Sequence, residues 1–142
     1  MLVGGFPELA LAEDDAYAQR RLREDVVDRV IKRDVMTLFN IRSPLMMEKL
    51  LVYLCLHSTQ LFNVTTASKE IGQISPVTLE SYLSALEMAN LIYIAKPIGV
   101  GSKAVLKGKP KIFVADAAIR NAVLMIDDVL SDETELGATI ET

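Results

Sequence analysis

The residues that could carry out acid–base, nucleophilic or metal chemistry are few. His57 is the only histidine and Cys55 the only cysteine. The sequence therefore holds no histidine pair for a metal, no recognisable Ser-His-Asp triad and no cysteine zinc site. His57 falls near the expected end of a helix, where interaction with the helix dipole is its simplest role. Cys55 falls on an apolar helix and is expected to be an unreactive core residue.

No phosphate-binding loop is recognisable either. Gly99-Val100-Gly101 precedes Ser102-Lys103, but this stretch lacks the downstream glycine and the Gly-Lys-Ser/Thr ending of a P-loop. Asp116 follows an apolar strand, where a carboxylate can be catalytic, although capping of the next helix is the simpler interpretation. We therefore expect this chain to hold no cofactor and no metal, and not to be an enzyme.

One helix in the middle of the chain begins with a clear local signal. Ser75 followed by Pro76 places an N-cap hydroxyl beside a proline at the first helical position, which predicts a helix over 77–90. Asn90 suits the left-handed conformation that ends many helices. The apolar residues of this segment recur at helical spacing: Leu79, Tyr82, Leu83, Leu86, Met88 and Ala89.

A shorter helix precedes this one and a β-hairpin follows it. Thr65 or Thr66 is expected to open the shorter helix, and Gly72 to end it. Residues 91–94 and 112–115 are β-rich runs on either side of a loop of glycines and lysines. Two helices joined by a tight turn and followed by a β-ribbon form the pattern of a winged helix.

A long amphipathic helix is expected near the N-terminus. It should begin after Asp14 or Asp15, either of which can cap it, and run to about Arg33, with a short helix or a bent continuation over 34–41. Its polar face carries Arg20, Arg21, Arg23, Glu24, Asp25, Asp28, Arg29 and Lys32, with several opposite charges three or four residues apart. We interpret this face as solvated; an anion-binding role is the alternative.

The most apolar segment is a helix expected from residue 45 to about residue 58. Ser43-Pro44 repeats the cap-and-proline signal at its start. A helix that is apolar on all sides is buried on most of them, so this one should be the first helix of a three-helix core.

A last helix, capped by Asp116, is expected over 117–130. The predicted fold class is mainly α with a small β-hairpin: a winged helix-turn-helix with an additional N-terminal helix and a C-terminal helix.

Length and composition fit one domain. The chain has 142 residues, of which 51% are hydrophobic. We expect an N-terminal loop over 1–13, the winged-helix domain over 14–130, and an acidic tail over 131–142. No apolar run approaches 18 residues and no signal peptide is visible, so we expect no membrane segment. A single cysteine fits a reducing, cytoplasmic setting.

The charge is unevenly distributed. Residues 1–15 carry four acids and residues 127–142 carry six, with no lysine or arginine in either segment. These ends account for −10, whereas the whole chain has a net charge of −4, so the middle carries +6. The acidic overall balance therefore does not exclude an anionic partner.

The helix that would enter a DNA groove is poor in basic residues. Segment 76–90 contains Glu80 and Glu87 and no lysine or arginine, although base readout relies on Arg, Lys, Asn and Gln, and phosphates repel carboxylates. Direct readout by this helix is disfavoured.

The hairpin loop favours binding to an anionic partner, because residues 96–111 contain five lysines and no acid. Such a loop can follow a phosphate backbone or meet an acidic protein surface, or its lysines can simply keep the sheet edge soluble. The residues that could contact nucleic acid or a protein partner are Ser75, Thr78, Ser81, Lys96, Lys103, Lys107, Lys109, Lys111 and Arg33.

Several short motifs resemble one family in matching order. They are Gly4-Gly5-Phe6-Pro7-Glu8, Lys32-Arg33-Asp34-Val35, Ser75-Pro76-Val77-Thr78, Tyr82-Leu83-Ser84-Ala85-Leu86-Glu87, Asn90-Leu91-Ile92 and Pro110-Lys111-Ile112-Phe113-Val114-Ala115-Asp116. They are similar to the region of unknown function that follows the nucleotide-binding core in bacterial and archaeal AAA-type ATPases. The resemblance covers almost the whole chain.

This resemblance implies a longer parent protein. A P-loop ATPase module would precede Met1 and a nuclease-like module would follow Thr142, so ATP and Mg would bind in the parent and not in this piece. Arg33-Asp34 matches a recurrent pair of the family, which either senses nucleotide or packs the winged helix.

The leading hypothesis is a non-catalytic module that couples nucleotide state to the ATPase and C-terminal domains. The alternatives are a DNA-binding module that uses the wing and the Arg-rich first helix, and an oligomerisation unit in which the apolar helix or the hairpin pairs with another copy.

Overall fold

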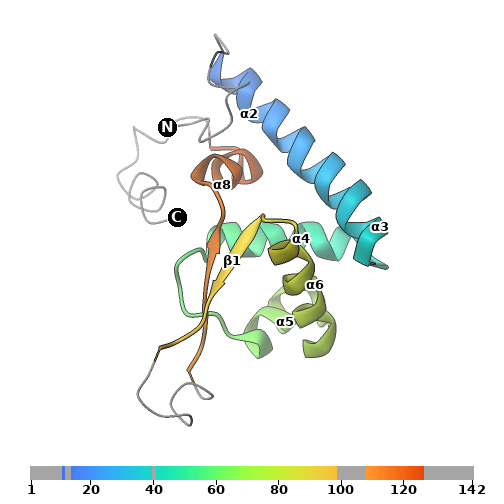
Figure 1. The fold of residues 1–142 in the computed structure, drawn as a ribbon, viewed down its shortest axis with the longest axis vertical. Helices are drawn as coiled ribbons and strands as arrows, with labels where there is room; N and C mark the ends of the chain where they lie inside the picture. The colour runs from blue at the N-terminus through green and yellow to red at the C-terminus, as the bar shows by residue number, and fades with distance from the viewer. Residues whose placement is uncertain (1–10, 12–13, 40, 99–107, 127–142) are drawn as a thin grey trace.

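The computed structural model describes residues 11, 14–39, 41–98 and 108–126. This part of the chain is mainly helical and contains one two-stranded antiparallel sheet, so the mainly α class with a small hairpin is confirmed (Figure 1). The elements are α2 (Asp15–Arg23), η1 (Glu24–Val35), α3 (Met36–Phe39), α4 (Pro44–Leu56), α5 (Val64–Gly72), α6 (Pro76–Met88), β1 (Ile92–Ala95), β2 (Lys111–Val114) and α8 (Ala117–Leu124). The expected N-terminal loop, the acidic tail and most of the hairpin loop lie outside the described residues.

The N-terminal helix changes character along its length. Asp14 caps α2 as predicted, with its Oδ1 accepting from the backbone N–H of Ala16 at 3.0 Å. From Glu24 onward the backbone adopts the wider π-helical turns of η1, and α3 continues the same rod (Figure 1). The rod runs past the expected end near Arg33, and the expected short helix or continuation after that point is confirmed as far as Phe39.

These wider turns explain how the rod buries its apolar residues. Leu22 and Ile31 are nine residues apart, which is two and a half turns at 3.6 residues per turn and would place them on opposite faces of an α-helix. Hydrogen bonds from residue i to i+5 lengthen each turn, and Leu22, Ile31 and Val35 all reach the same core.

Helix α4 crosses the centre of the molecule, but it is buried on one side only. Ser43 caps it, accepting from the N–H of Met46 at 3.4 Å, and Pro44 is its first residue. Its inner face consists of Met47, Leu50, Leu51, Leu54 and Cys55. Leu45, Val52 and Leu56 are exposed, so the prediction of burial on most sides is wrong for this outer face.

Helices α5 and α6 form the predicted pair with a tight turn. Asn63 caps α5, because its Oδ1 accepts from the N–H groups of Thr65 and Thr66 at 3.0 and 3.3 Å; the predicted threonine caps are wrong. Ser75 caps α6 as predicted, accepting from the N–H of Thr78 at 3.0 Å. Asn90 has φ 55°, the left-handed conformation expected after this helix.

The hairpin extends away from the helices (Figure 1). The strands pair with Ile92 opposite Val114 and Ala95 opposite Lys111, one residue from the predicted bounds. On the other side of β2, an isolated bridge joins Leu61 to Lys111. Among the described residues no strand pairs with the outer side of β1, so β1 is an edge of this sheet.

Helix α8 returns the chain to the core. Asp116 caps it, accepting from the N–H of Ala118 at 2.8 Å, as predicted. The helix ends at Leu124, and Met125 has φ 56°. The predicted helix is therefore confirmed over residues 117–124 and wrong at residues 125 and 126. Residues 127–130 lie outside the described part. Figure 1 shows α8 beside α2, above the level of α4.

Candidate functional site

The serines and threonine predicted on α6 have different surroundings. The hydroxyls of Ser75 and Thr78 lie 2.8 Å apart at the start of the helix, where Ser75 also acts as the N-cap. Ser81 is exposed. The exposed side chains of α6 beyond Pro76 are Val77, Glu80, Ser81, Ser84, Glu87 and Met88, and we call this set the α6 face. It contains two carboxylates, two serines, two large apolar side chains and no cation, so it presents none of the lysine or arginine side chains on which base readout relies.

The described lysines of the hairpin lie at the loop end of its strands. Lys96, Lys109 and Lys111 are exposed, and the pairing of Ala95 with Lys111 places Lys96 and Lys111 at the same end of the sheet. Lys103 and Lys107 lie outside the described residues. Arg33 is exposed on η1, an element that lies away from this end of the hairpin (Figure 1).

The reactive side chains considered in the sequence have ordinary structural surroundings. Cys55 is fully buried, and burial raises the pKa of its thiol to about 12, although the positive charge of Arg120 acts in the opposite direction. His57 is exposed and its Nδ1 lies 3.3 Å from Oε1 of Gln60. Within the described residues there is no cluster of three or more metal-ligating side chains.

The aromatic group nearest to His57 is also part of the packing. The ring centroids of Tyr53 and His57 lie 4.4 Å apart. Burial and a hydrogen bond to the Glu70 carboxylate raise the pKa of Tyr53, so its phenol stays protonated at neutral pH. Tyr53 therefore packs and donates a hydrogen bond, and it offers no phenolate.

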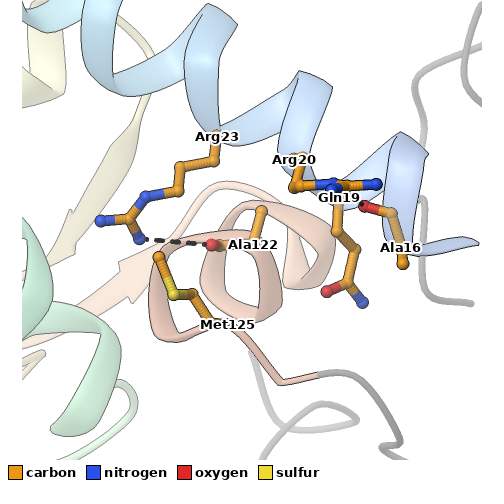
Figure 2. Close-up of a pocket in the computed structure, with 6 residues that line it drawn as sticks. All are labelled: Ala16, Gln19, Arg20, Arg23, Ala122 and Met125. Carbon is orange, nitrogen blue, oxygen red and sulfur yellow. Dashed lines mark hydrogen bonds between the residues drawn. The ribbon is translucent and has the colours of Figure 1, made fainter.

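A pocket between α2 and α8 was not predicted. It has a volume of about 360 Å³ and is lined by Ala16, Gln19, Arg20, Arg23, Ala122 and Met125 (Figure 2). Gln19 donates from Nε2 to the carbonyl of Ile126 at 2.9 Å, and Arg23 donates to the carbonyls of Ala122 and Val123. These bonds satisfy carbonyls at the C-terminal end of α8, which have no partner within the helix itself.

One sequence signal could have indicated this pocket. Gln19 and Arg23 are four residues apart and therefore lie on the same face of α2. The polar face predicted to be solvated includes Arg23 but not Gln19. Which carbonyls it meets could not be known, because α8 is about 100 residues away in the sequence.

Comparison with known proteins places the chain in a family. A family model described as a domain of unknown function, DUF8612, matches residues 1–130. The chain belongs to this family. This DUF8612 chain is also 26% identical over 121 residues to an uncharacterized protein of Haemophilus influenzae (strain ATCC 51907 / DSM 11121 / KW20 / Rd), a match that covers 82% of the chain and 30% of that protein. The chain thus spans less than a third of the length of this relative.

The comparisons leave the function of the DUF8612 chain open. No solved structure matches it. The family description, a domain of unknown function, agrees with the sequence analysis only on that point. Neither match names an ATPase or a winged helix. None of the described helices combines the length and the apolar character needed to cross a bilayer.

Proposed function

We propose that this DUF8612 domain is a non-catalytic winged-helix module of a larger P-loop ATPase, in which it couples the nucleotide state to neighbouring domains. Three observations support this proposal. The order α4, the Leu61 bridge, α5, α6, β1 and β2 matches that of a winged helix. The sequence motifs resemble those found after the core of AAA-type ATPases. The chain covers 30% of a longer relative.

The α6 face carries the proposal. In a winged helix that reads DNA, this helix enters the major groove and presents hydrogen-bond donors to bases and phosphates. Here the corresponding face has Val77 at 76% and Met88 at 67% exposure, and its charges are the carboxylates of Glu80 and Glu87. Carboxylates on a face without lysine or arginine repel a polyanion, and the exposed valine and methionine offer apolar surface to another protein domain.

The first experiment tests for nucleotide chemistry. The purified chain is titrated with ATP and Mg²⁺, and hydrolysis and binding are measured. We expect no hydrolysis and at best weak binding, because the sequence has no phosphate-binding loop. Turnover comparable to that of a genuine ATPase would overturn the proposal.

A second experiment tests the α6 face as the coupling surface. In the longer protein that contains this chain, Val77→Asp combined with Met88→Asp should abolish nucleotide-dependent protection of α6 amides in hydrogen exchange. Leu56→Asp is the matched control, because Leu56 is an exposed leucine (57%) on α4 and lies outside the α6 face. Unchanged protection in the double variant, or equal loss in the control, would contradict this role.

DNA binding through the hairpin is the second candidate, favoured by five lysines and no acid in residues 96–111. It predicts salt-dependent affinity for duplex DNA that drops when Lys103, Lys107 and Lys109 are replaced by alanine. Each lost phosphate contact should lower the slope of log affinity against log salt by about 1. Absence of binding at about 50 mM salt, where electrostatic contacts are strongest, would exclude this candidate.

A further inference from the structure

The pocket between α2 and α8 contains a buried hydrogen-bond acceptor without a donor. The side chain of Gln19 is 5% exposed, and its Nε2 donates to the carbonyl of Ile126 at 2.9 Å. This bond assigns which end of the amide is the nitrogen and which is the oxygen, because the flipped arrangement would place two oxygens against each other. The other atom of the amide, Oε1, is buried and has no hydrogen-bond partner. A buried acceptor in this state is costly and calls for an N–H or O–H donor.

Two arginines surround the same pocket. Arg20 is exposed and uses its Nε to bond the carbonyl of Ala16 at 3.3 Å. Arg23 is half-buried and uses one terminal nitrogen for the carbonyls at the end of α8. Since a guanidinium carries five N–H donors, both side chains keep donors for a ligand. Among the described lining residues the charged side chains are these two arginines, so this part of the lining carries a positive charge (Figure 2).

The remaining walls are apolar and the pocket is small. Ala16, Ala122 and Met125 complete the lining, and Met125 is 65% exposed at the mouth. A volume of about 360 Å³ lies at the lower end of the range of small-molecule sites, which combine apolar walls with a few placed polar groups.

The surrounding carbonyls favour a single negative charge over a double one. The carbonyls of Ala122, Val123 and Ile126 present the negative end of the α8 dipole next to the arginines, and Arg23 already compensates part of it. The dianion of a phosphate monoester would add a second charge beside these oxygens and has no O–H group to donate to Gln19. A carboxylate carries one charge and forms paired hydrogen bonds with a guanidinium.

We propose that this pocket binds a small organic carboxylate with an amide N–H next to it, which is the chemistry of an N-acylated amino acid or of a peptide C-terminus. The carboxylate lies against Arg20, the amide N–H meets Oε1 of Gln19, and an apolar side chain lies over Ala122 and Met125. Arg23 adds a second positive charge from the other side of the lining (Figure 2). The terminal torsion of a glutamine is broad, so a modest rotation turns Oε1 towards the incoming donor. This site is independent of the function proposed for the α6 face.

N-acetyl-L-leucine is the probe, titrated into the full chain and followed by the NMR signals of the Gln19 amide and the Met125 methyl. A ligand of about a dozen non-hydrogen atoms should bind with a dissociation constant on the order of 1 mM. We expect N-acetyl-L-leucinamide, which lacks the carboxylate, to bind at least about tenfold more weakly. Inorganic phosphate should bind more weakly than the probe.

Two variants locate the binding. Arg20→Ala should weaken the probe about tenfold, whereas Arg21→Ala should change it less than about twofold, because Arg21 does not line this pocket and pairs with Asp25. Gln19→Met keeps the size of the side chain and removes the acceptor, and should weaken the probe similarly. If that variant fails to fold, the comparison of Arg20→Ala with Arg21→Ala decides alone.

The affinities of two ligands distinguish a peptide C-terminus from a free small molecule as the natural ligand. A peptide ending in leucine that binds at least tenfold more tightly than the probe identifies a chain terminus as the ligand, and equal affinity identifies a small molecule; either result supports the proposal. Absence of saturable shifts at about 10 mM probe, tighter binding of phosphate, or equal affinity in Arg20→Ala and the wild type would overturn it.

Discussion

The carboxylate of Glu87 on α6 accepts a hydrogen bond from the backbone N–H of Ile94 on β1, with 3.1 Å between the carboxylate oxygen and the amide nitrogen. This contact joins the second helix of the pair to the hairpin. It also occupies a donor at the edge of the sheet. Free N–H groups on an edge strand can pair with a strand of another molecule, so the carboxylate protects the edge as well as anchoring it.

Replacing Glu87 by alanine should expose this donor. We expect a loss of at most about 1 kcal/mol in the free energy of unfolding, since the bond is partly solvated, together with concentration-dependent self-association. Urea denaturation and light scattering measure the two effects. Glu80→Ala is the matched control, being an exposed glutamate on the same helix. Identical behaviour of the two variants would refute the protective role of Glu87.

The two faces of α4 should respond differently to truncation. Leu54 is 2% exposed on the inner face, so Leu54→Ala should cost about 2–5 kcal/mol of unfolding free energy through the cavity it leaves. Val52 is 37% exposed on the outer face, and Val52→Ala should cost less than about 1 kcal/mol. Chemical denaturation measures both changes. Comparable losses would mean that the outer face of α4 is buried in solution, as it would be in a dimer.

Capping, and not ligand contact, should explain Ser75. Ser75→Ala removes the acceptor for the N–H of Thr78 and should lower the unfolding free energy by about 1 kcal/mol. Ser81→Ala, on the exposed part of the same helix, should change it by less than about 0.5 kcal/mol. Thermal unfolding distinguishes the two variants. If Ser75→Ala left stability unchanged but weakened binding of duplex DNA, the contact role considered from the sequence would be the correct one.

The buried thiol of Cys55 should make stability fall at high pH. Burial raises the pKa of Cys55 to about 12 in the folded chain, from 9.0 for an ordinary thiol, so the unfolded state releases its proton first. The contribution is complete below pH 9 and is lost between pH 9 and pH 12, at up to about 1.4 kcal/mol per pH unit.

The control for this prediction is Cys55→Ala, measured by urea denaturation from pH 8 upward. This variant should be less stable at neutral pH because of the lost packing, but its stability should fall less steeply above pH 9. Tyr53, whose pKa is also raised, contributes equally to both proteins and cancels in the difference. Parallel pH profiles would show that the thiol is not protected by burial. Thiol reagents at pH 8 should likewise react with Cys55 only after unfolding.

Local signals in the sequence were sufficient for most element boundaries. Ser43, Ser75 and Asp116 cap the helices predicted from them, and Asn90 takes the left-handed conformation. These features depend on hydrogen bonds between residues two or three positions apart, so composition and order determine them. The predicted start of α5 is wrong because Asn63, a stronger cap than threonine, begins this helix.

The sequence by itself determined the order of helices and strands and most of the helix caps, because these depend on residues close together in the chain. Tertiary structure decided three other things: the wider turns that bring Ile31 to the core, the open outer face of α4, and the pocket where α2 meets α8. Each of these depends on which surface packs against which. Gln19 and the carbonyl it bonds are 107 residues apart, a distance over which local propensities carry no information and only the packing of the folded chain selects partners.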